Sequence, residues 1–218
     1  MLLYSRMHIG RERGREVFVR VIAGSKKGIE LRGGHGPFFR PTQQLVKESI
    51  FNTIGADIRG ASILELFAGS GAVGIEALSR GAARAVFVEQ DRTSLKTLRT
   101  NLDRCGFGPE AAVIRMGDAL RYIERAAAQA QLFDFIFADP PYAAKTAAQR
   151  IVDVVGSAGV ALCRTLIIEH ANAIVAAEGG ALALAKARRF GQTTVSYFTC
   201  RKEAAGGEGK GRALPGNV

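Results

Sequence analysis

Apolar residues follow two different periodicities along the middle of the chain. Short apolar runs alternate with longer segments in which apolar residues recur every three or four positions. The short runs are typical of buried β-strands, and the longer segments are typical of helices that pack one side on a sheet. Strands that alternate with helices predict βαβ units and a parallel sheet covered on both faces. We expect strands at 62–67, 85–88, 112–115, 133–138 and 165–169, with helices at 71–79, 93–104, 118–130 and 145–155.

The two ends of this alternating region carry different patterns. Near the N-terminus, two apolar runs flank a Gly-Ser-Lys-Lys-Gly turn and predict a small β-hairpin. Thr42 is the expected N-cap of a further helix, which Gly55 is expected to end. Near the C-terminus, two runs around a Gly-Gln pair predict an antiparallel hairpin. These additional strands are expected at 17–23, 29–31, 185–190 and 193–199.

Together the elements predict an α/β, Rossmann-like fold. Its sheet is expected to have seven strands, mostly parallel, with an antiparallel C-terminal hairpin. The N-terminal β-hairpin is expected to be a small extension of this domain.

The charge of the chain is concentrated at its two ends. The formal net charge is +10, yet residues 42–185 hold 14 Lys or Arg against 15 Asp or Glu. Residues 1–41 hold nine basic residues against three acidic ones, and residues 186–218 hold seven against two. A near-neutral domain between basic ends is typical of an enzyme whose flanking segments bind a polyanion. The alternative interpretation is that both ends are simply solvated tails.

Composition disfavours several classes of protein. The 218 residues, 47% of them hydrophobic and 23% charged, suit one globular domain with small additions. No run approaches the roughly 18 apolar residues of a membrane helix, and the start of the chain lacks the features of a secretion signal. Three widely spaced cysteines argue against a disulfide framework and against a zinc site. We therefore expect a cytoplasmic protein that needs neither a metal ion nor a membrane.

A glycine-rich segment follows the first strand of the alternating region and opens the next helix. Residues 65–74 are ELFAGSGAVG, so Gly69, Gly71 and Gly74 satisfy the G-x-G-x-x-G pattern of dinucleotide-binding turns. The next strand ends at Glu89, 20 residues after Gly69, where a carboxylate can bind ribose hydroxyls. These features suit either an NAD site or an S-adenosylmethionine site.

Two carboxylates favour S-adenosylmethionine. Glu65 lies inside the strand, where it would sit near the ammonium group of that cofactor, whereas the pyrophosphate of NAD gains nothing from a negative charge there. Asp118 follows the third strand and can accept a hydrogen bond from the adenine amino group or cap the next helix, and these two roles are compatible. The expected cofactor-binding residues are Glu65, Phe67, Ala68, Gly69, Ser70, Gly71, Glu89, Gln90, Asp118 and Ala119.

The tetrapeptide Asp139-Pro140-Pro141-Tyr142 directly follows the fourth strand. Its two prolines fix the backbone and remove two N–H donors, which leaves carbonyl groups in set directions. An exocyclic base amine is a poor nucleophile because its lone pair is delocalised into the ring. Asp139 and the Pro140 carbonyl can accept its two hydrogens and aim the nitrogen at a methyl donor, while Tyr142 stacks on the base. These four residues form the expected catalytic loop of an amino-methyltransferase.

The motifs resemble those of class I methyltransferases that modify amino groups. A narrower resemblance is to the bacterial 16S rRNA guanine-N2 methyltransferases named for guanine 966, and it covers roughly residues 17–202. It implies methyl transfer from S-adenosylmethionine to the N2 amine of a guanine in small-subunit rRNA. The segments that carry this narrower resemblance are 20–24 (RVIAG) with Gly28, 40–42 (RPT), 47–48 (KE) and 51–52 (FN).

The resemblance also implies how the chain is organised around its RNA. Arg40, Pro41 and Thr42 would close over the cofactor and substrate. The N-terminal hairpin would contact RNA through Arg20, Lys26, Lys27 and Arg32. A monomer that acts on rRNA, either free or within an assembly particle, is expected. The expected regions are a basic flexible arm (1–16), the RNA-contacting hairpin and loop (17–41), the methyltransferase domain (42–202) and a disordered tail (203–218).

Three other hypotheses share part of this evidence. A DNA or other RNA amino-methyltransferase, acting on adenine N6 or guanine N2, would use the same tetrapeptide. For DNA, however, the chain offers no segment large enough to be a target-recognition domain. An NAD-dependent oxidoreductase would share the glycine-rich turn, and a non-catalytic RNA-binding protein would share the scaffold.

Overall fold

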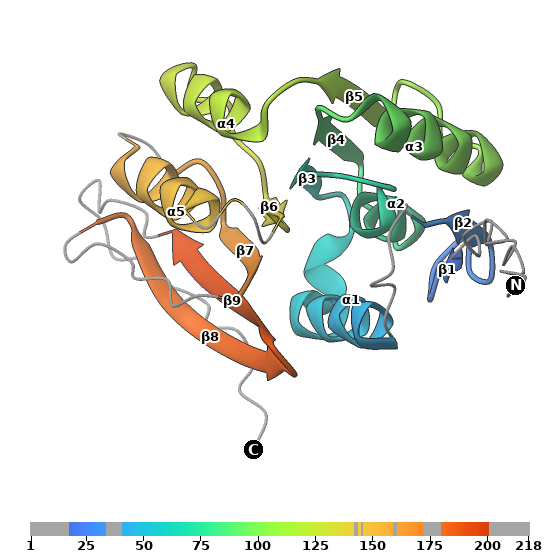
Figure 1. Cartoon of the computed structure of the whole chain (residues 1–218), viewed down its shortest axis with the longest axis horizontal. Helices are drawn as coiled ribbons and strands as arrows, with labels where there is room; N and C mark the ends of the chain where they lie inside the picture. The colour runs from blue at the N-terminus through green and yellow to red at the C-terminus, as the bar shows by residue number, and fades with distance from the viewer. Residues whose placement is uncertain are drawn as a thin grey trace, which may run out of the picture.

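A seven-stranded sheet forms the centre of the molecule (Figure 1). Its strands are β3 (Ser62–Leu66), β4 (Arg84–Glu89), β5 (Ala112–Met116), β6 (Phe135–Ala138), β7 (Thr165–His170), β8 (Leu182–Phe190) and β9 (Thr193–Cys200). The strand order is β5-β4-β3-β6-β7-β9-β8. The neighbouring strands β5, β4, β3, β6 and β7 pair in parallel, and β9 pairs antiparallel with both β7 and β8. The predicted α/β architecture with an antiparallel C-terminal hairpin is confirmed. The computed structural model describes residues 18–33, 41–141, 144, 146–158, 161–171 and 180–200.

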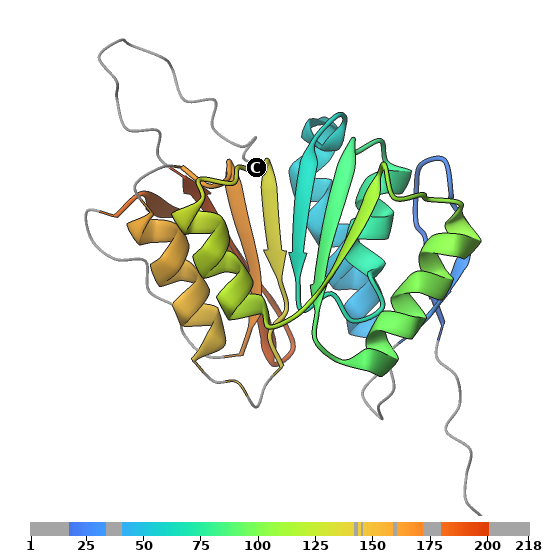
Figure 2. The same ribbon diagram turned by 90° about the horizontal axis from the view of Figure 1, so that it is seen from above.

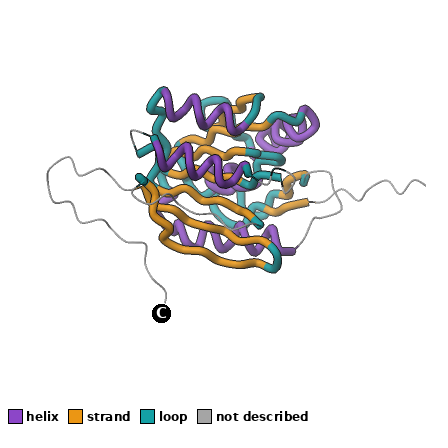
Figure 3. Tube along the Cα trace, turned by 60° about the vertical axis from the view of Figure 1, so that its left-hand side comes forward, coloured by secondary structure: helices purple, strands orange, loops and turns teal. Residues whose placement is uncertain are grey.

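Helices cover both faces of this sheet. On one face lie α1 (Pro41–Ile54), α2 (Ala72–Ser79) and α3 (Arg92–Cys105). On the other lie α4 (Ala119–Ala128) and α5 (Ala147–Ser157). In Figure 2 the strands run between these two groups of helices, and Figure 3 shows the same layers in a side view. A short 3₁₀ helix, η1 (Gly55–Ile58), joins α1 to the start of β3.

The alternation of side chains along the strands separates two hydrophobic cores. In β7, Ile167 packs in the core with α1, α2 and α3, whereas Leu166 and Ile168 pack in the core with α4 and α5. In β6, Phe137 belongs to the first core and Ala138 to the second. Successive residues of a strand point to opposite faces, so strand sequences that are apolar throughout fit a sheet covered on both sides.

A small two-stranded sheet packs against the first core. It consists of β1 (Phe18–Arg20) and β2 (Glu30–Arg32), which pair antiparallel as predicted. Val21 and Leu31 are buried in the core that also contains α1, α2 and α3. The predicted arm (1–16) and tail (203–218) lie outside the described residues.

Three predicted boundaries are wrong, and those of β1 and β8 differ by three residues, which is more than the blurring expected at element ends. β1 ends at Arg20 rather than at Ala23, because the N–H groups of Ile22 and Ala23 donate to Glu76 instead of to a strand partner. α1 begins at Pro41, so Thr42 lies within the helix rather than at its N-cap. β8 begins at residue 182 rather than 185, because its pairing with β9 continues across a register shift.

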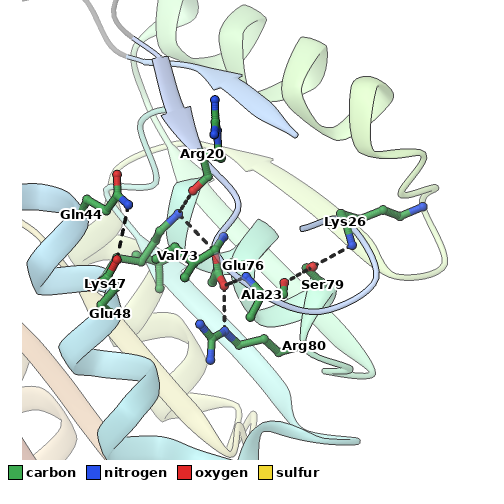
Figure 4. Close-up of polar contacts among 12 residues, drawn as sticks. Arg20, Ala23, Lys26, Gln44, Lys47, Glu48, Val73, Glu76, Ser79 and Arg80 are labelled. Carbon is green, nitrogen blue, oxygen red and sulfur yellow. Dashed lines mark hydrogen bonds and ion pairs between the residues drawn. The ribbon is translucent and has the colours of Figure 1, made fainter. Parts of the chain in front are cut away.

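A buried ion-pair network joins the hairpin to α1 and α2 (Figure 4). Glu76 of α2 is fully buried and accepts hydrogen bonds from the backbone N–H groups of Ile22 and Ala23 at 2.8 and 3.0 Å. Its carboxylate also lies 3.2 Å from Lys47 Nζ of α1 and 2.7 Å from Arg80 Nε. Lys47 in turn donates to the Arg20 carbonyl at 2.9 Å. One carboxylate therefore holds together three segments that are far apart in sequence.

Two further findings bear on the sequence predictions. Within the described residues, no helix is long and apolar enough to cross a membrane. Cys163 and Cys200 are free, yet their Sγ atoms lie 3.1 Å apart. Cys163 lies just before the start of β7, and Cys200 ends its antiparallel neighbour β9. The spacing of 37 residues gave no indication of this contact.

Candidate active site

The glycine-rich turn and the Asp139 loop meet where the sheet topology reverses. β3 and β6 are neighbours, but the chain continues from β3 to β4 on one side and from β6 to β7 on the other. In open parallel sheets, ligands bind in the crevice at the carboxyl ends of such strands. Leu66 and Ala138 are paired at these ends. The two predicted motifs, about 70 residues apart in the sequence, therefore lie side by side.

The backbone of the turn requires residues without bulky side chains. Gly69 and Gly71 have φ values of 54° and 76°, and Phe67 shares this left-handed conformation with φ 56°. Strained non-glycine residues of this kind are concentrated at ligand-binding sites. Gly74 is needed for another reason, because a Cβ at this position would overlap the Phe87 ring. The result is a tight cradle in which Gly69 keeps a partly exposed backbone.

Glu65 of β3 has a buried carboxylate that contacts the start of α2. The residue is 3% exposed, and its side chain accepts hydrogen bonds from the N–H groups of Gly74 and Val73 at 2.8 and 3.3 Å. Burial raises the pKa of Glu65 to about 8, although these two hydrogen bonds and the charge of Lys47 act in the opposite direction. A cationic group bound beside such a carboxylate would stabilise its charged form. This environment fits the predicted contact with an ammonium group.

Glu89 fixes the other side of the turn. Its side chain accepts a hydrogen bond from Gly69 N–H at 2.8 Å, and two more from the N–H groups of Gln90 and Asp91, also at 2.8 Å. A carboxylate has about four acceptor sites. Glu89, which is partly exposed, therefore keeps acceptor capacity for a ribose hydroxyl.

The remaining predicted cofactor residues lie around the same edge of the sheet. Asp118 accepts a hydrogen bond from Arg121 N–H at 2.8 Å, which confirms that it caps α4; its contact with adenine stays a prediction. Ala119 is buried in the first turn of α4. Ala68 N–H donates to the Val88 carbonyl at 3.0 Å and so ties the turn to β4.

The donor and acceptor groups of this cradle suit S-adenosylmethionine better than NAD. In dinucleotide-binding turns, the N–H groups at the helix N-terminus bind the pyrophosphate. Here the N–H groups of Val73 and Gly74 already donate to Glu65, whose carboxylate would repel a diphosphate. The ammonium and sulfonium groups of S-adenosylmethionine are cations, which this carboxylate attracts.

Asp139 begins the loop after β6. It is exposed, whereas the preceding residue, Ala138, is fully buried. Nearby protein atoms displace water from the Asp139 carboxyl group, and this desolvation is the main reason why its pKa is raised to about 8. The negative charges of Glu169 and Glu65 also contribute to the increase. Contact with solvent screens part of this effect. A carboxyl group that changes charge near neutral pH thus stands beside the cofactor cradle.

The rest of the predicted catalytic loop is only partly described. Pro140 is half-buried, and the Pro141 carbonyl accepts a hydrogen bond from Ala144 N–H at 2.8 Å. Tyr142 lies outside the described residues, so its stacking role stays a prediction.

The predicted RNA residues form two groups. Arg20 and Arg32 lie on the outward face of the hairpin, where Arg20 pairs with Glu30 at 2.8 Å. Lys27 is exposed in the turn, whereas Lys26 is half-buried with its Nζ 5.5 Å from the centre of the Phe107 ring. Their RNA contacts stay predictions.

The second group belongs to the start of α1. Arg40 lies outside the described residues, and Pro41 and Thr42 are placed by backbone alone. The C-terminal end of α1 leads through η1 to the start of β3, so the helix runs antiparallel to that strand. Its first turn therefore points toward the carboxyl edge of the sheet, as a segment that closes over the site requires.

Two site residues had no signal in the sequence. Asn101 of α3 is fully buried; its side chain accepts from Arg32 N–H at 2.8 Å and donates to the carbonyls of Arg32 and Ser70, both at 2.9 Å. It connects the hairpin directly to the glycine-rich turn. Glu169 lies near the end of β7, beside Asp139, and burial raises its pKa as well. Among the described residues, no group of three His, Cys, Asp or Glu side chains could hold a metal ion.

Comparisons with known proteins agree with this geometry. "Putative rRNA methyltransferase YlbH" of Bacillus subtilis is 48% identical over 124 residues, which are 57% of this chain and 67% of that protein. "Ribosomal RNA small subunit methyltransferase D" of Haemophilus influenzae is 37% identical over 133 residues, 61% of this chain and 68% of that protein. The solved structure "Putative methyltransferase yhhF from Escherichia coli" superposes with a TM-score of 0.69 at 27% identity, covering 86% of this chain and all of that one.

The family model described as "Conserved hypothetical protein 95" matches residues 19–199. This range includes the hairpin, the cofactor cradle and the Asp139 loop, and it nearly coincides with the span of the predicted resemblance. The resemblance to the rRNA guanine-N2 methyltransferases is confirmed, and the chain belongs to the family described as Conserved hypothetical protein 95.

Proposed function

We propose that this protein transfers a methyl group from S-adenosylmethionine to the exocyclic N2 amine of a guanine in small-subunit rRNA. The observation that supports the proposal most directly is the position of Asp139, next to the cofactor cradle at the topological switch point. The relatives named above as rRNA methyltransferases support the class of acceptor.

Each part of the site has a task in this reaction. S-adenosylmethionine supplies a methyl group made electrophilic by its sulfonium. Glu65 holds the ammonium end of the cofactor, and Glu89 holds its ribose. Asp139 and the Pro140 carbonyl accept the two hydrogens of the guanine amine and direct its nitrogen at the methyl carbon. The rate gain then comes mainly from positioning and from electrostatics. After transfer, the amine loses a proton, and Asp139 is placed to accept it.

The acceptor is a folded RNA rather than a flexible strand. The exposed basic residues that we propose as RNA contacts, Arg20, Lys27 and Arg32, lie on one compact hairpin, which suits a substrate whose shape is already formed. We propose that the protein acts as a monomer in the cytoplasm on an assembly particle of the small subunit. The basic residues outside the sheet would supply most of the affinity for phosphate.

Methyl transfer from labelled S-adenosylmethionine to small-subunit particles tests this function. The particles should come from cells that lack the protein, and digestion followed by mass spectrometry should find the label in N2-methylguanosine. Asp139→Ala is expected to lower transfer by at least about a thousandfold, because it removes an acceptor that orients the nucleophile. Label in N6-methyladenosine, or no label although S-adenosylmethionine stabilises the wild-type protein, would contradict the proposal.

The same variant separates catalysis from cofactor binding. Asp139 does not form part of the turn that holds the cofactor, so Asp139→Ala should keep the thermal stabilisation given by S-adenosylmethionine. Glu65→Gln is the matched variant, since it should lose that stabilisation. Stabilisation of the wild type by NAD alone would favour an oxidoreductase instead.

A further inference from the structure

A further carboxylate, that of Glu169, stands at the carboxyl edge of the sheet beside Asp139. Ala138 of β6 pairs with Ile168 of β7, so Asp139 and Glu169 follow at the same level on neighbouring strands. Ile167 and Phe137 face the core formed with α1, α2 and α3. By alternation along the strands, Glu169 and Asp139 point to that same side, as Glu65 does.

The carboxyl group of Glu169 keeps hydrogen-bond acceptor sites for a ligand. The residue is half-buried, and the Thr193 hydroxyl, which lies 3.4 Å from the His170 carbonyl, also interacts with the Glu169 carboxyl group and partly offsets the effect of burial on its pKa. Thr193 itself is buried at the start of β9. A carboxylate offers about four acceptor sites, so a single hydroxyl donor leaves most of them available to a ligand.

Two carboxylates on adjacent strand ends form a site that favours a ligand with neighbouring N–H donors. Like charges at short range repel each other, which contributes to the raised pKa of Asp139. Donors placed between the two carboxylates would relieve this repulsion. The Watson–Crick edge of guanine has such a pattern, with N1–H directly beside the N2 amine. Adenine has an acceptor at N1 and would place a lone pair against a carboxylate.

We propose that Glu169 accepts the N1–H of the guanine whose N2 amine Asp139 holds, and that it thereby selects guanine over bases with an acceptor at N1. This inference rests on the proposed function and adds a specificity-determining residue to it. Asp139 then orients the nucleophile, while Glu169 identifies the base to which that nucleophile belongs.

The base analogue 2-aminopurine separates the two tasks, because it keeps the amine at position 2 but has an acceptor at N1. Once the labelling experiment has located the methylated guanine, small-subunit particles would be reconstituted with rRNA in which this guanine is either kept or replaced by 2-aminopurine. For the wild type, kcat/KM should favour guanine by roughly a hundredfold, since the half-buried Glu169 carboxylate would otherwise face a lone pair. Glu169→Gln offers an amide N–H that can donate to N1 of 2-aminopurine and a carbonyl that can accept guanine N1–H, so 2-aminopurine should become about as good a substrate as guanine.

Glu169→Ala is the matched variant. It removes the hydrogen-bond acceptor without adding a donor. The ratio of kcat/KM for guanine to kcat/KM for 2-aminopurine should therefore fall toward one without dropping below it. Cofactor-induced thermal stabilisation, measured for both variants, checks that they are folded. If both variants lose activity on both RNAs in the same proportion, Glu169 has only a structural role and the inference is wrong. If the wild type labels neither RNA, the proposed function fails with it; if it labels both equally, only the inference fails.

Discussion

Three glutamates and one aspartate show how position decides the chemistry of a single functional group. Glu89 is partly exposed and bound by three backbone N–H groups, which suits a fixed acceptor for hydroxyls. Glu65 is buried, and its raised pKa suits a partner for a cation. Asp139 and Glu169 influence each other at adjacent strand ends. Residue type alone therefore did not distinguish the carboxylates that we propose for cofactor binding from those that we propose for base recognition.

The raised pKa of Asp139 predicts a pH dependence of transfer. Only the carboxylate form accepts both an amine hydrogen and, later, a proton. Because the pKa is raised to about 8, this form is depleted below that pH and present above it. At saturating cofactor, kcat/KM for RNA should therefore rise roughly thirtyfold between about pH 6.5 and pH 9 and then level off.

Asp139→Asn isolates the contribution of this one group. Its amide carbonyl accepts a hydrogen bond but does not titrate, so the variant should be slower and should lose most of the rise with pH. Glu65 titrates in a similar range and remains in both proteins, so its contribution cancels in the comparison. An unchanged pH profile in Asp139→Asn would show that another group controls the rate.

At the scale of elements, Glu76 determines how the hairpin sits on the domain. Its carboxylate satisfies the backbone after β1 and pairs with Lys47 of α1, and both charged residues are buried. Burial lowers the pKa of Lys47, which reflects the cost of a charge in this position. Removing one partner of a buried pair leaves the other uncompensated.

Glu76→Gln is therefore expected to destabilise the fold by about 3 kcal/mol. The chain offers a matched control in Glu124, whose ion pair with Arg150 has the same 2.7 Å distance as the Glu76–Arg80 pair but is about half exposed. Glu124→Gln should change the unfolding free energy by less than about 1 kcal/mol. Urea denaturation of both variants measures the difference, and equal effects would show that the network contributes little.

Sequence patterns predicted the elements better than their long-range contacts. The central strands and helices were placed within about two residues, because burial on a sheet imposes its period directly on the sequence. Asn101 could not be recognised in the sequence, because a polar residue in a helix is usually exposed. Its side chain is instead bound to β2 and to the glycine-rich turn, and these long-range contacts leave no mark on the sequence pattern. Glu169 was missed for a related reason: its neighbour Asp139 is adjacent only through the pairing of β6 with β7.

At the scale of the whole molecule, the strand order brings residues that are far apart in the sequence to one edge of the sheet. The cradle after β3, the loop after β6 and Glu169 of β7 all lie at the carboxyl edge. The first turn of α1 points to the same edge, and Asn101 links the cradle to the hairpin. The outer surfaces of α4 and α5 lie on the opposite side of the sheet (Figure 1). This arrangement predicts that RNA approaches from the hairpin side.

Salt dependence of RNA binding tests this direction of approach. Each phosphate contact contributes roughly 0.7 to 0.9 to the slope of log affinity against log salt concentration. Arg32 is exposed on the hairpin while Asn101 holds its backbone, so Arg32→Ala should reduce the slope by about this amount without unfolding the protein. Arg125 is an exposed arginine on α4, and Arg125→Ala should leave the slope unchanged. The opposite ranking, measured by filter binding to small-subunit rRNA, would place the RNA on the other face. Phosphate contacts would then come from α4 rather than from the hairpin.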